Sequence, residues 1–216
     1  MLGAAESRTM ITRALMLLLL ALPCTATAAV TPDRPSANWP QAADRGDALL
    51  RRTALRLHND ARRRFGVAPL TWNEGLAAAA QAYAAQMAVT GIYQHDPTPG
   101  RRKLMGENLW RGQRGVFGYE VMIGLMVDED ALFQPGVFPA ISRTGSWHDV
   151  GHYTQIVWPT TTEVGCATAS SATTDYLVCR YAPTGNKDGT ALVPGGARLS
   201  VAALTVAAGD PLAPLP

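Results

Sequence analysis

The imidazole of His152 is the side chain best placed for chemistry, and it lies in the run Gly151–Trp158, GHYTQIVW. Imidazole binds metals and exchanges protons near neutral pH. The glycine favours a turn, and the β-forming residues after it predict a strand that leaves this turn. His152 would then lie at the mouth of a strand and face a cleft. A lone histidine in such a run is more often structural than chemical, so its neighbours decide the interpretation.

A second run lies downstream, Cys179–Asn186, with the sequence CRYAPTGN. The two runs resemble the two signature motifs of the CAP superfamily, nearly residue for residue. That superfamily includes cysteine-rich secretory proteins, insect venom allergens, plant pathogenesis-related proteins and many bacterial secreted domains, which this chain resembles most. The resemblance implies an α/β fold, a three-layer α-β-α sandwich around a central, mainly antiparallel sheet (the CAP or SCP fold).

The resemblance also implies a cleft built from two histidines and two glutamates. His95 is similar to the family's first cleft histidine and His152 to its second, while Glu107 lies in Gly106–Trp110, GENLW, which resembles a family Gly-Glu-Asn-Leu motif. The assignment of Glu129 as the second glutamate depends on the register of a family motif whose tryptophan is missing here. The cleft would be supported by Asn108 and Gln155, and the acids that remain alternatives to Glu129 are Asp128 and Asp130.

Two neutral imidazoles close together suit Zn²⁺ or another divalent cation, and a nearby carboxylate can ligate the ion or orient the rings. Two neighbouring carboxylates raise the pKa of one of them, so Glu107 and Glu129 are also candidates for acid–base catalysis through a metal-bound water. The sequence contains no HExxH and no GxSxG motif. Alternatively, the four groups hydrogen-bond one another and only hold the cleft in shape.

The sequence is therefore compatible with three functions. A secreted binding domain would hold a divalent cation and an extracellular ligand such as a lipid, a sterol or a cell-envelope component. A metal-dependent hydrolase, such as a protease, would need the two glutamates for turnover. A structural interaction domain of the envelope would carry an inert set of four residues. The apolar side chains of Phe117, Met122 and Met126 are compatible with a lipid groove, but such residues more often form an ordinary hydrophobic core.

The periodicity of apolar residues predicts a helix over Asp47–Phe65. A second helix is expected to start at a capping box, with Thr71 as N-cap and Glu74 reaching back, and to run to about Thr90. A third helix is expected over roughly 119–133, and strands over about 163–169 and 175–182. On the first helix a solvated basic face is expected, or a surface for acidic lipids, from Arg51, Arg52, Arg56, Arg62, Arg63 and Arg64. His58 is expected to be structural, and His148 exposed.

The 216 residues, with a net charge of +2, suffice for one domain with a sizeable core and give no argument for binding nucleic acid. Residues 1–28 are typical of a signal peptide, with cleavage near Ala28 and an apolar run too short to span a bilayer. No transmembrane segment is expected in the mature chain, so it would be secreted or periplasmic. The expected divisions are the signal peptide 1–28, a linker 29–47, the CAP domain 48–190 and a C-terminal tail 191–216.

Removal of the signal peptide would leave two cysteines, Cys166 and Cys179. An even pair in an exported chain predicts one disulfide, here across two successive strands. Two buried free thiols are the alternative.

Overall fold

The computed structural model describes residues 42–196. The expected signal peptide, its cleavage site and most of the expected C-terminal tail lie outside the described residues. Within residues 42–196, no helix combines the length and the apolar character needed to cross a membrane.

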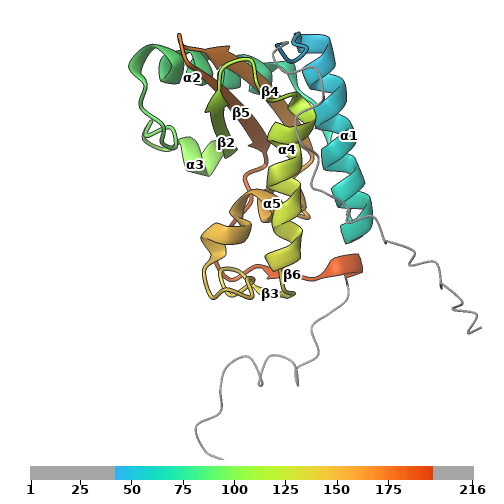
Figure 1. Ribbon diagram of the computed structural model, residues 1–216. Coiled ribbons are helices and arrows are strands. Elements are labelled where there is room, and N and C mark those ends of the chain that lie inside the picture. Colours follow the sequence, from blue (N-terminus) through green and yellow to red (C-terminus); the bar gives the residue numbers. More distant parts are fainter. Residues whose placement is uncertain (1–41, 197–216) are drawn as a thin grey trace, which may run out of the picture. The chain divides into compact units, whose positions relative to one another are not determined.

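A four-stranded sheet forms the centre of the fold, in the order β1-β4-β5-β2 (Figure 1). Strand β5 pairs antiparallel with both β2 and β4, and only the short β1 runs parallel to its neighbour β4. A separate two-stranded sheet pairs β3 with β6, and β6 lies beyond residue 190. The strands are β1 (Thr71–Trp72), β2 (Gly106–Gln113), β3 (Gly136–Val137), β4 (Glu163–Ser170), β5 (Thr174–Ala182) and β6 (Ala191–Leu192).

Helices cover both faces of this sheet, which confirms the expected α-β-α sandwich. Helix α2 packs on one face, against β4 and β5, while α1, α4 and α5 contact one another on the other face. The helices are α1 (Asp47–Phe65), α2 (Glu74–Thr90), α3 (Arg101–Leu104), α4 (Tyr119–Val127) and α5 (Gly151–Ile156), with 3₁₀ turns at Asp128–Leu132, Trp147–Val150 and Pro194–Gly196.

Strand β5 separates two hydrophobic cores because successive side chains of a strand point to opposite faces. Leu177, Cys179 and Tyr181 belong to the larger core, with α1, α4 and α5, whereas Tyr176 and Val178 belong to the core under α2. Met122 and Met126 are buried in the larger core, which accounts for their apolar character.

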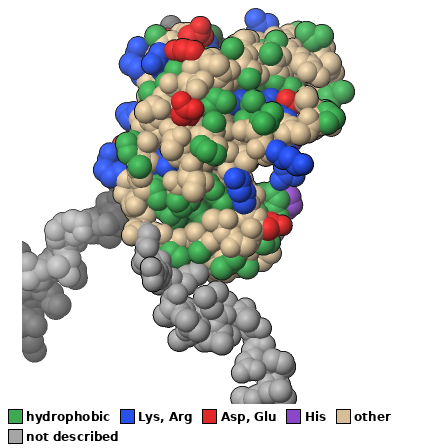
Figure 2. Space-filling view, turned by 180° about the vertical axis from the view of Figure 1, so that it is seen from behind, with side chains coloured by type: hydrophobic (Ala, Val, Ile, Leu, Met, Phe, Trp, Pro, Cys, Tyr) green, Lys and Arg blue, Asp and Glu red, His purple; other side chains and the backbone are tan. Residues whose placement is uncertain are grey.

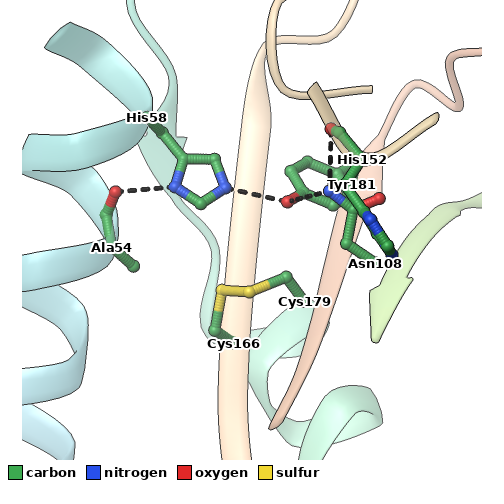
Figure 3. Close-up of a disulfide and its surroundings, with 7 residues drawn as sticks. All are labelled: Ala54, His58, Asn108, His152, Cys166, Cys179 and Tyr181. Carbon is green, nitrogen blue, oxygen red and sulfur yellow. Dashed lines mark hydrogen bonds between the residues drawn. A yellow bond between two sulfur atoms is a disulfide. The ribbon is translucent and has the colours of Figure 1, made fainter. Parts of the chain in front are cut away.

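The predicted disulfide is present, and it joins two directly opposed residues of β4 and β5. Cys166 and Cys179 are register partners, and their sulfur atoms are bonded. The bond lies on the α1 side of the sheet (Figure 3). A disulfide of this kind fits an extracellular location.

The expected strand at residues 151–158 is wrong, because Gly151–Ile156 forms helix α5. The β-forming side chains are overridden by packing: Tyr153, Ile156 and Val157 are buried at the i, i+3, i+4 spacing of a helix face. His152 therefore lies at the start of a helix.

Two further helix predictions need correction at their ends. Thr71 is not the N-cap of α2, because its backbone pairs with β4; the cap is Asn73, whose side chain accepts a hydrogen bond from the Leu76 N–H at 3.0 Å. The third helix is α-helical only to Val127 and continues as a 3₁₀ turn to Leu132.

Arg62 does not belong to the solvated basic face of α1 that the sequence predicted. Its side chain is buried, and its guanidinium donates hydrogen bonds to the carbonyls of Ile156, Trp158 and Thr161 at 2.8–2.9 Å, while Nε donates to the Ala68 carbonyl. Burial lowers the pKa of Arg62 to about 10, so the group stays charged at neutral pH. These hydrogen bonds of Arg62 link α1 to the end of α5 and to the segment that follows it.

Candidate functional site

A cavity of about 310 Å³ opens beside the start of α5. Five of the six residues expected at the cleft line it, and the sixth, Glu129, contacts one of them, His152. The five are His95, Glu107, Asn108, His152 and Gln155.

His95 and Glu107 form the first of two histidine–glutamate pairs. His95 lies in the loop between α2 and α3, and its Nδ1 is 2.6 Å from Oε1 of Glu107 on β2. The glutamate side chain is fully buried, whereas 62 % of the imidazole surface is exposed. The carboxylate therefore contacts the ring on its buried side, at Nδ1. Nε2 of His95 has no hydrogen-bond partner in the described part of the chain.

Two arginines and a backbone amide surround the Glu107 carboxylate. Arg180 lies opposite Glu107 across the β2–β5 ladder and places NH1 2.7 Å from Oε2, while NH2 of Arg101 is 3.6 Å from Oε1. The Asp96 N–H donates to Oε1 at 3.1 Å. Arg180 also binds the Asp96 carboxylate at 2.7 Å.

The charge state of Asp96 follows from these contacts. Burial would raise the pKa of its carboxyl, but hydrogen bonds from Thr98 and Arg180 and the charge of Arg180 outweigh burial and lower the pKa below its ordinary value. A carboxylate with several donors around it stays ionised. The buried cluster of two arginines and two acids thus balances its own charge.

His152 and Glu129 form the second pair. Nδ1 of His152 is 2.5 Å from Oε1 of Glu129, whose Oε2 accepts hydrogen bonds from the backbone N–H groups of His152 and Tyr153 at 2.9 and 3.0 Å. Free N–H groups at a helix start attract a carboxylate, so one glutamate both caps α5 and orients the imidazole. Of the three adjacent acids, Glu129 makes this contact, whereas Asp130 lies 3.9 Å from Arg64.

Gln155 holds the loop after β5 at the edge of the cavity. Its Oε1 accepts from the Gly185 N–H at 3.0 Å, and its Nε2 donates to the Thr161 hydroxyl at 3.3 Å. Gly106 lies so close that an added Cβ would meet the Gln155 side chain. Gln155 therefore supports the cleft through its contacts with the chain.

Asn108 connects the cleft to the interior of the fold (Figure 3). Its amide nitrogen donates to the His152 carbonyl and to the Tyr181 hydroxyl, both at 3.0 Å. The Tyr181 oxygen is 2.8 Å from Nε2 of His58, whose Nδ1 is 2.7 Å from the Ala54 carbonyl. A carbonyl can only accept, so Nδ1 of His58 carries the proton and Nε2 accepts from Tyr181. His58 is structural, as the sequence predicted.

We expect stability to fall in acid partly because His58 must stay neutral. Burial, reinforced by the charge of Arg62 and opposed by the Ala54 hydrogen bond, lowers the pKa of His58 from 6.5 to about 4. The unfolded chain therefore takes up this proton first. The stability that His58 contributes is complete above about pH 6.5 and is lost as the pH falls towards 4, by up to about 3 kcal/mol.

Urea unfolding at a series of pH values between 7 and 4 measures this effect. The His58→Gln variant, which has no titrating ring, should lose stability less steeply over this range than the unchanged protein. Equal slopes for the two proteins would contradict this assignment.

In the two pairs, the ring atoms that the described residues leave without a partner are the Nε2 atoms of His95 and His152. A carboxylate on Nδ1 fixes the tautomer of an imidazole and leaves Nε2 as the ligand atom, as carboxylates behind ligand histidines do in metal sites. No three His, Cys, Asp or Glu side chains in the described residues could together hold a metal. The protein would thus supply two nitrogen ligands, and water or a bound molecule would supply the others.

The buried partners of Glu107 were not identified from the sequence. Asp96 adjoins His95, and Arg180 lies within the CRYAPTGN run, but nothing in the sequence gives them a role. The signal is the register of β2 against β5, which places Arg180 opposite Glu107. That register becomes visible only once the two strands are paired.

Comparison with known proteins identifies the family. Residues 55–181, more than half of the chain, match the model of the cysteine-rich secretory protein family, CAP. Pathogenesis-related protein 1B of Nicotiana tabacum is 37 % identical over 134 residues, which cover 61 % of this chain and 74 % of the tobacco protein. Venom allergen 5 of Vespa velutina is 35 % identical over 125 residues, which cover 54 % and 57 % of the two chains.

Solved structures agree with this at the level of the fold. The crystal structure of NaASP2 with Zn²⁺ has a TM-score of 0.57 at 22 % identity and covers 71 % of this chain and 90 % of its own. The structure of BmVAL-1 has a TM-score of 0.55 at 20 % identity and covers 69 % of this chain and 84 % of its own. With its two signature runs, its sandwich fold and its matching sequence, the chain belongs to the cysteine-rich secretory protein (CAP) family.

Proposed function

We propose that the protein is an exported binding domain, cleaved near Ala28, whose cleft holds Zn²⁺ or another divalent cation on His95 and His152. The cation and the cavity walls would together bind an extracellular ligand, such as a lipid, a sterol or another envelope component. One observation carries this proposal: each imidazole is tied through Nδ1 to its own carboxylate, at 2.6 and 2.5 Å. This arrangement prepares Nε2 of each ring to bind a metal.

The same geometry favours binding over hydrolysis. A general base needs a carboxylate that can reach a substrate or a water. Glu107 is buried between His95, Arg180 and the Asp96 amide, and Glu129 is occupied by His152 and two N–H groups of α5. Both carboxylates therefore act on the histidines and have little capacity left for proton transfer.

Calorimetric titration with Zn²⁺ tests the proposal on the mature chain. We expect one bound ion per molecule with an affinity near micromolar. The double variant His95→Ala/His152→Ala should lose this binding. Glu129→Gln should weaken it by about 10–100-fold, because a carboxylate that orients a ligand histidine contributes that much to metal affinity.

His148→Ala is the matched control for this titration. His148 also lines the cavity, but its ring stacks on Trp147 and contacts no carboxylate in the described residues. The control should bind Zn²⁺ like the unchanged protein. Equal binding by the double variant, or no binding by any of these proteins, would refute the proposal and leave the four residues as a scaffold.

A further inference from the structure

The two glutamates at the cleft differ in how their charge is compensated within the described residues. Glu107 is held by Arg180, at 2.7 Å, and by the Asp96 N–H. Glu129 is held by two N–H groups of α5. Glu107 thus belongs to a cluster that balances its own charge, whereas Glu129 has no arginine or lysine partner in the described residues and would balance one of the two charges of a cation on the imidazoles.

The two arginines that line the cavity differ in how far their charge is compensated. Arg101 donates to the carbonyls of Asp96 and Met105, and its guanidinium lies 3.6 Å from the Glu107 carboxylate. Arg102 also lines the cavity, is exposed, and makes no ion pair or side-chain hydrogen bond within residues 42–196. The space-filling view shows basic side chains close to a histidine at one edge of the molecule (Figure 2).

We infer that the ligand of this cleft is an anion, a molecule with a carboxylate or phosphate group, and that Arg102 selects it. This inference rests on the proposed metal site. Two neutral imidazoles add no negative charge, so Glu129 alone would leave part of the double charge of the cation uncompensated, and open coordination positions would remain beside the cation. A carboxylate or phosphate compensates that charge, and a guanidinium binds either group through two parallel hydrogen bonds.

The size of the cavity limits how much of the ligand it encloses. A volume of about 310 Å³ is at the small end of the range for small-molecule sites. The cleft would therefore enclose one anionic group with the atoms next to it, such as a single acidic sugar or a lipid headgroup. The rest of a larger ligand would remain outside.

Binding of two matched pairs of small molecules tests the inference on the zinc-loaded mature chain. D-glucuronate is compared with D-glucose, and glycerol 3-phosphate with glycerol, by NMR titration. In at least one pair the anion should bind tenfold or more tightly than the neutral molecule. The pair that shows the preference tells a carboxylated sugar from a phosphate headgroup. The His95→Ala/His152→Ala protein in the same zinc solution corrects for anions that bind free zinc.

Arg102→Ala and Lys103→Ala separate a specific contact from general basic charge. Both residues are exposed and adjacent on α3, but only Arg102 lines the cavity. Arg102→Ala should weaken anion binding about tenfold and leave zinc affinity unchanged, whereas Lys103→Ala should change neither. Zinc binding without preference for the anions, or equal effects of the two variants, would overturn this inference alone. Absence of zinc binding would overturn the proposed function as well.

Discussion

Arg62→Met should lower the free energy of unfolding by about 3 kcal/mol or more. The substitution keeps an unbranched apolar stem but removes the guanidinium donors to the carbonyls of Ile156, Thr161, Ala68 and Trp158, although the Trp158 carbonyl keeps a bond from the Thr161 N–H. A buried polar group that loses its partner costs about 1–3 kcal/mol, and several lose it here. Relief from burying the guanidinium offsets only part of this loss. Urea unfolding followed by tryptophan fluorescence should show a lower midpoint.

Arg63→Met is the control, because Arg63 is the next residue of the same helix turn and its guanidinium is exposed, with a single partner at Asp60. Exposed pairs of this kind contribute about 0–1 kcal/mol. The control should therefore shift the unfolding midpoint only slightly. Similar losses for the two variants would show that Arg62 does not fasten the segment after α5.

Gly165→Ala should destabilise the protein by about 3 kcal/mol, because the added methyl group has no room. A Cβ at this position of β4 would lie 2.6 Å from the Asn73 carbonyl oxygen and 2.7 Å from the Leu76 carbonyl carbon, and it would also meet the Ala77 nitrogen. All three atoms belong to the backbone at the start of α2, so the whole helix would have to move. Overpacking of a well-packed interior typically costs 1–3 kcal/mol.

Gly124→Ala provides the comparison, since a Cβ on this glycine of α4 meets nothing within 4 Å. Alanine favours a helix over glycine by about 1 kcal/mol, so this variant should be slightly more stable than the unchanged protein. The two variants should thus shift the thermal midpoint in opposite directions. A neutral Gly165→Ala would mean that α2 does not lie this close to β4.

Some of this fold could be predicted because local pattern and tertiary packing agree. The apolar spacing of Leu50, Ala54, Ala61 and Phe65 gave the bounds of α1, and all four side chains are buried. The alanines of α2 leave room for close packing, and Gly165 of β4 completes the contact of this helix with the sheet. In both elements the sequence pattern and the environment require the same conformation.

Other features depend on partners that are distant in sequence. Residues 151–156 have β-forming side chains, yet they are helical because Glu129 caps them and the α1–α4 core buries their apolar side. Arg62 and Arg63 are the same residue type in neighbouring positions, and only the packed structure shows that one is buried. Sequence periodicity does not contain either piece of information.

The candidate site was likewise predicted from the sequence only in part. The resemblance to the CAP superfamily named both histidines and both glutamates, and the structure brings each histidine against one glutamate. The roles of the two glutamates depend on Arg180 and on the N–H groups of α5. The position of Arg180 depends on strand register, and the N–H groups are free only because a helix begins at residue 151.

A crystal structure of the mature chain with Zn²⁺, with the metal located by its anomalous scattering, tests the central claim most directly. We predict one strong peak in the cavity, with Nε2 of His95 and Nε2 of His152 at about 2.0–2.1 Å. Glu107 and Glu129 should remain on the Nδ1 atoms and outside the coordination shell. Zinc bound to either carboxylate, zinc only at other surface sites, or an empty cavity would contradict the account.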